Sequence, residues 1–209
     1  MTRIESIAQK ADGAGRYLVK FSDETSIRLY RQTVEDFGLY TGLELSQEEM
    51  ENLRANAGAV SAKMRAVRIV SAANVSKKDL QQRLIQKGET PEQAKEAVQW
   101  LSDMNLLDDG QTARQVVQSC IAKGYGVARA RQALYEKQIP KRYWEEALEG
   151  YPDQSERILA YLKSKITSRE DPREVKRAVD ALLRRGHSYG QIRSCLNELN
   201  LENDFREDE

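Results

Sequence analysis

The sequence contains few of the residues from which cross-links and metal sites are built. Its 209 residues include two cysteines, Cys120 and Cys195, and one histidine, His187. Two cysteines so far apart are too few for a disulfide framework, and they cannot supply the CxxC pairs of a zinc site. Each lies among apolar residues at helical spacing, which indicates a buried thiol. A lone histidine also offers no Ser–His or Cys–His pair for nucleophilic catalysis.

Long apolar runs are missing as well. No segment approaches the ~18 apolar residues of a membrane helix, and MTRIESIAQKAD has no apolar core of the kind a signal peptide needs. Neither a GxxxxGK[ST] phosphate loop nor a GxGxxG fingerprint after a strand occurs. Only 4 prolines and 12 glycines interrupt a chain of which 32% is charged. We therefore expect a helical cytoplasmic protein away from membranes, with no catalytic residue, metal or cofactor.

Charge of one sign is not in excess overall, because the net charge is zero, but it is unevenly distributed. Residues 1–60 carry 7 basic and 10 acidic side chains, residues 61–201 carry 25 and 18, and residues 202–209 carry 1 and 5. The basic middle, at +7, favours binding to a polyanion or an acidic protein surface. The alternative is a solvated helical surface with a chance excess of basic residues.

Residues 1–45 have the period of β-strands. RYLVKF and SIRLY alternate in polarity and are joined by the polar SDET, which predicts a hairpin. TRIESIAQK fits a further strand, ended by the turn-forming ADGAG. QTVEDFG predicts a short helix that stops at Gly38. Because a lone hairpin is marginal in water, this segment is expected to pack on another part of the chain.

From Ser46 onward the pattern is helical. Ser46 and Glu49 have the spacing of a capping box, in which each side chain bonds the backbone N–H of the other. Apolar residues then follow at steps of three and four, which predicts one stripe along a long helix that Gly58 bends or interrupts. The residues of the stripe are Met50, Leu53, Ala57, Val60, Met64 and Val67.

The remainder of the chain contains an internal repeat with offsets of 50 and 48 residues. Leu84, Leu134 and Leu182 fall in register, as do sets of apolar residues further along each unit. Each unit is predicted to hold a lead helix, at about 61–73, 111–123 and 154–166, followed by a helix–turn–helix pair. Because such a unit buries little alone, neighbouring units should stack. The apolar sets in register are Ala94, Trp144 and Ile192, then Ala97, Ala147 and Cys195, then Val98, Leu148 and Leu196.

Two adjacent aspartates, Asp108 and Asp109, lie where one unit meets the next. They are candidates for metal binding or acid–base chemistry, but no DxD, HxxE or HExxH pattern accompanies them. Carboxylates at a helix start satisfy free N–H groups and face the positive end of the helix dipole. We interpret both as structural caps, together with Ser46, Ser76 and Asp171, the last of which precedes a proline suited to the first helical position.

An L-x-D-D step precedes a helix with Ala113, and a Gly-rich turn at Gly124 and Gly126 leads into a basic helix. The third unit reads L-x-R-R-G-H-S. These segments resemble the RecX family, bacterial regulators of the RecA recombinase, except that His187 replaces an aromatic residue of the family pattern. This change is expected to loosen packing or to leave a partly polar spot. The first unit, at VSKKDL, lacks the basic residue that precedes the serine in the family.

The resemblance, over roughly 61–199, implies the architecture. The expected fold is mainly α, a curved array of three tandem three-helix, helix-turn-helix-like repeats with a small N-terminal β-hairpin segment. The segments are residues 1–45, the β-rich part; 46–108, the long helix and repeat one; 109–152, repeat two; 153–201, repeat three; and 202–209, an acidic tail.

The resemblance also implies a partner. A RecX-like monomer would lie in the groove of the RecA–DNA filament and limit ATP turnover, filament extension and strand exchange in DNA repair and the SOS response. It would meet single- or double-stranded DNA within the filament, or weakly alone. The alternatives are a stand-alone helical DNA-binding module and a generic protein-binding scaffold. The candidate contact residues are Lys123, Tyr125, Arg129, Arg131, Lys137, Lys141, Arg142, Arg184, Arg185 and Arg193, with Tyr189 beside them.

Overall fold

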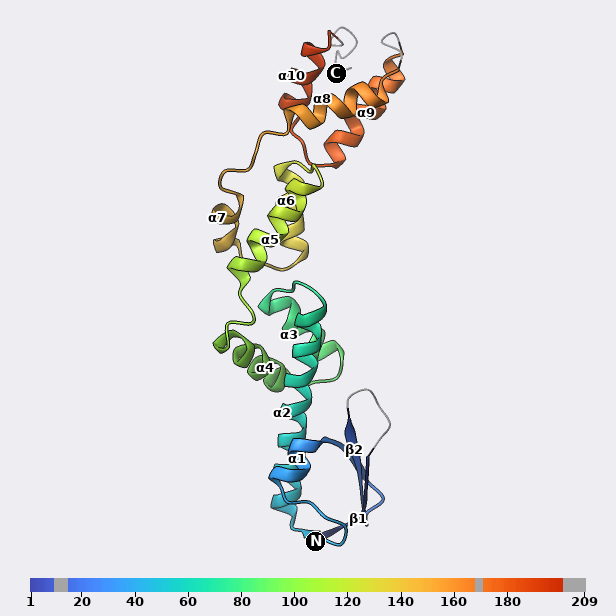
Figure 1. Ribbon diagram of the computed structural model, residues 1–209, viewed down its shortest axis with the longest axis vertical. Helices are drawn as coiled ribbons and strands as arrows, with labels where there is room; N and C mark the ends of the chain where they lie inside the picture. The colour runs from blue at the N-terminus through green and yellow to red at the C-terminus, as the bar shows by residue number, and fades with distance from the viewer. Residues whose placement is uncertain (10–14, 168–170, 201–209) are drawn as a thin grey trace. The chain divides into compact units, whose positions relative to one another are not determined.

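The computed structural model describes residues 1–9, 15–167 and 171–200, which belong to two compact units, Met1–Leu107 and Asp108–Glu209 (Figure 1). Most of the expected ADGAG turn and the whole acidic tail at 202–209 lie outside the described residues. The segment boundaries given above stay predictions. No described helix combines the length and the apolar character that a membrane crossing requires.

The N-terminal unit begins with a four-stranded sheet of order β3-β2-β1-β4 rather than a lone hairpin. The predicted hairpin and the further strand are present, and β4 is an addition too short to show a period in the sequence. β1 pairs antiparallel with both β2 and β4. The strands are β1 (Thr2–Gln9), β2 (Arg16–Phe21), β3 (Ser26–Tyr30) and β4 (Glu44–Leu45).

One face of the sheet is closed by the short helix α1 (Arg31–Asp36) and the first half of α2 (Gln47–Ala72). Alternate strand residues enter this core, as a half-buried antiparallel sheet requires. The chain leaves α1 through Gly38, which has a positive φ of 56°. The core contains Ile4, Val19, Phe21, Leu29, Leu39, Leu45, Met50 and Leu53.

Helix α2 is continuous across Gly58 and begins at the predicted capping box. Ser46 Oγ accepts from the N–H of Glu49 at 3.2 Å, and Glu49 accepts from the N–H of Ser46 at 2.8 Å. The predicted single stripe holds as far as Ala57, which packs against the sheet core, and is wrong at Met64, which is 40% exposed. Ala62 and Ala66 are fully buried instead.

The reason is a change of partner along the helix. Leu53 packs in the sheet core, whereas Ala62 packs against α3 (Lys77–Gln86) and α4 (Pro91–Asp103). Nine residues at about 100° each place these two side chains on opposite faces of α2. A stripe of constant phase cannot describe a helix that buries one face and then the other.

Repeat one is completed by α3 and α4, which pack beside the second half of α2. Ser76 is the N-cap of α3 and accepts from the N–H of Asp79 at 3.1 Å. Thr90 and Gln93 form a capping box at the start of α4, followed by Pro91 at the first helical position. Leu84 is completely buried here, as the repeat register predicted.

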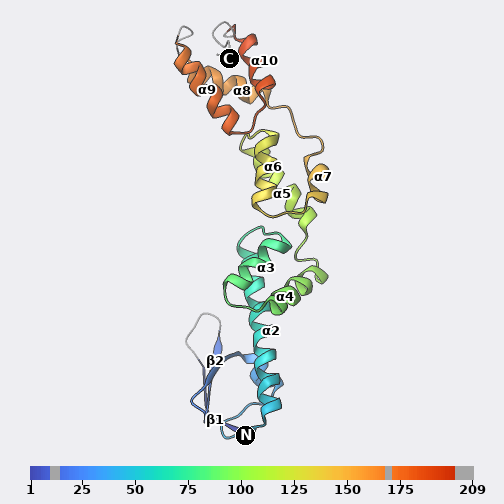
Figure 2. The same ribbon diagram turned by 180° about the vertical axis from the view of Figure 1, so that it is seen from behind.

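The C-terminal unit holds two further helical groups (Figure 2). Each has its own hydrophobic cluster. Leu134 is completely buried in one cluster and Leu182 is 1% exposed in the other, which confirms the leucine register. The first group is α5 (Asp109–Ala122), α6 (Val127–Glu136), the short 3₁₀ turn η1 (Lys141–Tyr143) and α7 (Trp144–Leu148). The second is α8 (Ser155–Lys165), α9 (Pro172–Arg184) and α10 (Tyr189–Glu198).

Two residues of the repeat pattern differ from their expected places. Asp108 is the N-cap of α5 and accepts from the N–H of Gly110 at 2.7 Å. Asp109 is the first helical residue rather than the N-cap itself, and it is almost fully buried. Trp144 lies at the edge of its cluster rather than inside it, and its Nε1 donates to the carbonyl of Ile139.

Candidate partner interface

Repeats two and three are joined through two turns of the backbone. The N–H of Gly126, at the start of α6, donates to the carbonyl of Arg185 at 2.9 Å. The N–H of Ala128 donates to the carbonyl of Gly186 at 3.3 Å. Arg157 on α8 reaches the end of α5 and donates to the carbonyl of Ile121 at 2.6 Å. These bonds fix the backbones of the two turns relative to each other.

Glycine is required on both sides of this joint because the backbones touch. A Cβ on Gly126 would lie 2.0 Å from the carbonyl oxygen of Gly186. A Cβ on Gly186 would lie 2.2 Å from the backbone nitrogen of Arg129, and its φ of 85° also favours glycine. The Gly-rich turn of the sequence therefore serves close packing between repeats.

His187 completes the joint as a buried side chain. Its Nε2 lies 3.1 Å from the carbonyl of Gly124, whereas Nδ1 has no hydrogen-bond partner among the described residues. Burial is the main cause that lowers the pKa of His187, and the nearby charge of Arg185 acts in the same direction. The histidine is thus a neutral packing residue that leaves one polar atom unsatisfied, as the partly polar alternative expected.

Tyrosine 151 ties the end of repeat two to the same turn. Its hydroxyl donates to the carbonyl of Tyr125 at 2.7 Å. Burial is the largest cause that raises the pKa of Tyr151 to about 12, so the hydroxyl keeps its proton and remains a donor at neutral pH. The backbone of Tyr125 is consequently held in the turn before α6.

An open pocket of about 500 Å³ lies over this joint. Repeat two contributes Lys123, Tyr125 and Arg129 to its walls, and α9 contributes Arg184 and the neighbouring Arg185. Five of the sequence-predicted contact residues therefore come together around one cavity. Tyr161 of α8 and Ala181 of α9 complete the lining.

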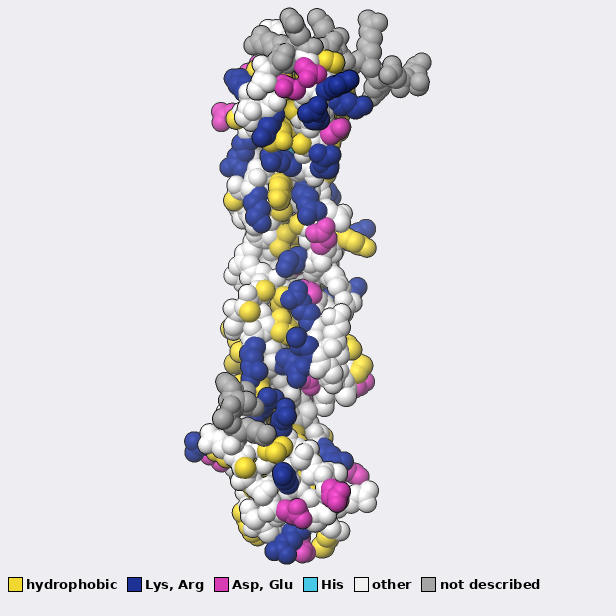
Figure 3. Space-filling model, turned by 90° about the vertical axis from the view of Figure 1, so that its right-hand side faces the viewer, with side chains coloured by type: hydrophobic (Ala, Val, Ile, Leu, Met, Phe, Trp, Pro, Cys, Tyr) yellow, Lys and Arg dark blue, Asp and Glu magenta, His cyan; other side chains and the backbone are white. Residues whose placement is uncertain are grey.

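The electrostatics of the pocket favour an anion. Four cationic side chains line it, and no carboxylate is among the lining residues that the structure describes. The guanidinium of Arg185 stacks on Tyr161, with 4.4 Å between its Cζ and the ring centroid, which orients the charge. On the face shown in Figure 3, Lys and Arg side chains of the C-terminal unit gather around apolar side chains.

The other predicted contact residues lie away from this pocket. Arg131 forms an ion pair with Glu145 at 3.1 Å, and Arg142 stacks on the ring of Tyr143. Arg129 lines the pocket but also forms an ion pair with Glu136. Hydrogen bonds from Gln132, the larger cause, and from Arg129 hold the pKa of the Glu136 carboxyl below its usual range. The remaining candidates outside the pocket lining are Lys137, Lys141, Tyr189 and Arg193.

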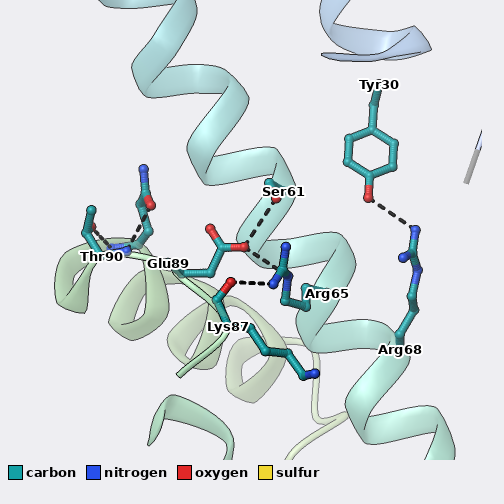
Figure 4. A network of polar contacts seen from close by, with 8 residues as sticks. Tyr30, Ser61, Arg65, Arg68, Lys87, Glu89 and Thr90 are labelled. Carbon is teal, nitrogen blue, oxygen red and sulfur yellow. Dashed lines mark hydrogen bonds and ion pairs between the residues drawn. The ribbon is translucent and has the colours of Figure 1, made fainter. Parts of the chain in front are cut away.

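Sequence reasoning missed two parts of the basic surface. Tyr161 joins the pocket from the lead helix of repeat three, and its place one turn from the buried Ile158 was the available signal. A second basic pocket lies in the N-terminal unit, where Arg65 and Arg68 of α2 approach Lys87 and Tyr30 (Figure 4). Its residues are too far apart in sequence to form a recognisable motif.

Metal-binding side chains do not gather in the part of the chain that the structure describes. No group of three His, Cys, Asp or Glu side chains within it could hold a metal ion. Both cysteines are free and buried, as predicted, and burial is the main cause that raises the pKa of each thiol. What the arrangement supports is the recognition of an anionic partner.

Comparisons with known sequences agree with this architecture. The family model described as "RecX, second three-helix domain" matches residues 108–148. "Regulatory protein RecX" of Clostridioides difficile (strain 630) is 27% identical over 206 residues, which are 95% of each chain. "Regulatory protein RecX" of Vibrio parahaemolyticus is 28% identical over 147 residues, covering 69% of this chain and 95% of the relative.

Solved structures show the same fold. A "Crystal structure of regulatory protein RecX" superposes with a TM-score of 0.64 at 19% identity and covers 96% of this chain and 99% of the other. A "Crystal structure of RecX from Lactobacillus salivarius" gives a TM-score of 0.60 at 22% identity, over 69% of this chain and 97% of the other. The helical repeat, the matched second domain and the similarity along nearly the whole sequence all support the RecX family of regulatory proteins.

Proposed function

We propose that this regulator binds the filament that the RecA recombinase forms on DNA and limits its ATPase, extension and strand exchange. It acts in the cytoplasm and by binding, without chemistry of its own. The resemblance of the sequence to RecA regulators supports the choice of partner. The pocket of Lys123, Arg129, Arg184 and Arg185 is the observation that carries the proposal, because a DNA-containing filament is a strongly anionic target.

The rigid joint beneath the pocket supports a role in recognition. The backbone bonds of the joint, such as the one from Gly126 to Arg185, hold the turns that carry these cations. Tyr161 also orients the guanidinium of Arg185 before any partner arrives. Binding then requires less ordering of flexible side chains, and ordering is a large cost of association. The proposal therefore assigns both the charge and its preorganisation to the same function.

The test is inhibition of the DNA-dependent ATPase of RecA by a charge-reversed variant. Lys123→Glu with Arg184→Glu changes two exposed pocket residues for which no ion pair with described residues is recorded. The matched control, Lys163→Glu with Lys176→Glu, makes the same charge change at exposed positions of the same unit outside the pocket. Circular dichroism would establish that both variants are folded.

We expect the pocket variant to need at least about tenfold more protein for half-inhibition, because hydrogen bonds to charged groups are worth ~1.5–3 kcal/mol each. Inhibition by the wild type should also weaken with salt, which screens exposed charges over ~8–10 Å. Equal inhibition by the two variants would show that the pocket is not the contact. Tight binding of the wild type to naked DNA with no effect on RecA would instead favour a stand-alone DNA-binding module.

A further inference from the structure

The basic pocket of the N-terminal unit has a volume of about 470 Å³. It lies between the sheet, the second half of α2 and the end of α3. Among the lining residues that the structure describes there are five cations and no carboxylate. The polar side chains that define it are Arg16, Tyr30, Arg65, Arg68, Arg83 and Lys87.

Two of its guanidinium groups are held in place by bonds from the pocket wall. The hydroxyl of Tyr30 accepts from Arg68 Nη2 at 3.2 Å (Figure 4). Arg65 donates from Nη1 to the carbonyl of Lys87 at 2.6 Å and pairs through Nε with the buried carboxylate of Glu89 at 3.0 Å. Ser61 donates to the same carboxylate and steadies it.

These bonds leave donors for a ligand. An arginine side chain has five N–H donors in a planar fork. Within the described residues, Arg68 forms one hydrogen bond, to Tyr30. Over the same residues, Arg65 bonds only the carboxylate of Glu89 and the carbonyl of Lys87. Both groups are therefore oriented by the protein and still have unused donors, as a prepared anion site requires.

The pocket also occupies the same place in repeat one as the pocket of Lys123, Arg129, Arg184 and Arg185 does in repeat three. We call the latter the partner pocket. Lys87 and Arg185 each lie three residues after the register leucine, and Lys137 holds that position in repeat two. In both pockets the cation at this position lies beside the lead helix, α2 in repeat one and α8 in repeat three. A tyrosine from outside the repeat, Tyr30 of β3 or Tyr125 of the turn before α6, completes each of them.

We propose that the N-terminal pocket binds a phosphate group of a nucleic-acid backbone. A phosphodiester presents a charge and acceptor oxygens that suit the guanidinium forks of Arg65 and Arg68. A cation recurring at one position of every repeat suits a polymer that carries a charge on every residue, whereas an acidic protein surface has no such regularity. The assignment deepens the proposed function, because the DNA of the filament would supply the phosphate.

The test is binding of a fluorescein-labelled single-stranded oligo(dT) by the full chain, without recombinase, across a series of salt concentrations. Arg68→Ala with Lys87→Ala removes two exposed cations of the pocket. Lys78→Ala with Lys95→Ala is the matched control, because both residues are exposed in the same unit and outside the pocket. Tyr30→Phe removes only the hydroxyl that holds Arg68.

The pocket variant should bind about tenfold more weakly than the control, and its slope of log K against log salt should be shallower by roughly 1.4, at ~0.7 for each lost contact to a single strand. Tyr30→Phe should weaken binding less and leave the slope unchanged, because both charges remain. Equal affinity and slope for the pocket and control variants, or no DNA binding by the wild type, would overturn the assignment. So would normal DNA binding by the pocket variant with lost RecA inhibition, which would identify an acidic protein partner. Since the DNA-binding measurement contains no recombinase, failure of the proposed function is detected separately, in the ATPase assay on the same variants.

Discussion

The joint between repeats two and three should not tolerate a single added methyl group at Gly126. In Gly126→Ala the new Cβ would lie 2.0 Å from the carbonyl oxygen of Gly186 and 2.5 Å from the backbone nitrogen of His187. Backbone cannot yield as the end of a flexible side chain can, so the two turns must separate. The backbone angles of Gly126, φ −81° and ψ 168°, are open to alanine, which means that the strain comes only from the contact.

The expected magnitude follows from the bonds that cross the joint. Separation breaks the bonds from Gly126 to Arg185, from Ala128 to Gly186, and between His187 and Gly124. Each is worth ~0.5–1.5 kcal/mol. Alanine is also a poorer N-cap than glycine, which adds up to ~1 kcal/mol. We expect a total loss of about 2–5 kcal/mol in the free energy of unfolding.

Urea denaturation followed by tryptophan fluorescence measures this loss. In a Trp100→Phe background, Trp144 is the single tryptophan, and it lies at the edge of the repeat-two core. Gly190→Ala is the matched control, because a Cβ there has nothing within 4 Å. It should be neutral or slightly stabilising. A loss below ~1 kcal/mol for Gly126→Ala, which the cap alone explains, would refute the close backbone contact.

Three further variants test the core, a cap and the buried histidine. Leu134→Ala should lower the unfolding free energy by ~2–5 kcal/mol in the same assay by opening a cavity, whereas Leu183→Ala, at a position 42% exposed, should change it little. Asp108→Ala should cost ~1 kcal/mol through the lost N-cap, and an unchanged midpoint would contradict the capping role. Folding lowers the pKa of His187, so the unfolded chain takes up the proton first as the pH falls below the unfolded pKa of ~6.5. The contribution of His187 to stability should therefore be full above that pH and be lost as the pH falls through the folded pKa. His187→Phe should flatten this dependence in unfolding curves recorded at several pH values, and an equally steep dependence in the variant would assign it to other groups.

Features set by neighbouring residues could be predicted from the sequence. The capping box of Ser46 and Glu49 needs only a three-residue spacing, and the burial of Leu84, Leu134 and Leu182 follows from a register that the chain states three times. Both depend on local geometry or on repetition, which a sequence displays directly.

Features set by tertiary contacts could not be predicted from the sequence. The exposure of Met64 depends on where α2 leaves the sheet core and enters the core of repeat one, and no local pattern marks that point. Tyr161 lines the partner pocket because α8 packs against α9. Tyr30 accepts a hydrogen bond from Arg68, a residue 38 positions away in the sequence. The partner pocket was found only in part for the same reason, since its basic residues and Tyr125 were recognisable in the sequence and Tyr161 was not.

Helix α2 buries opposite faces in two cores, and this limits which insertions and deletions the N-terminal unit can accept. Its 26 residues, about 39 Å at ~1.5 Å each, belong at one end to the sheet core and at the other to repeat one. Deleting a single residue between Leu53 and Ala62 would turn one core by ~100° relative to the other. Evolution or protein engineering can therefore exchange the sheet for another element only if the junction preserves the phase of the helix. Insertions in whole multiples of about 18 residues, five full turns, would be the ones that α2 accepts.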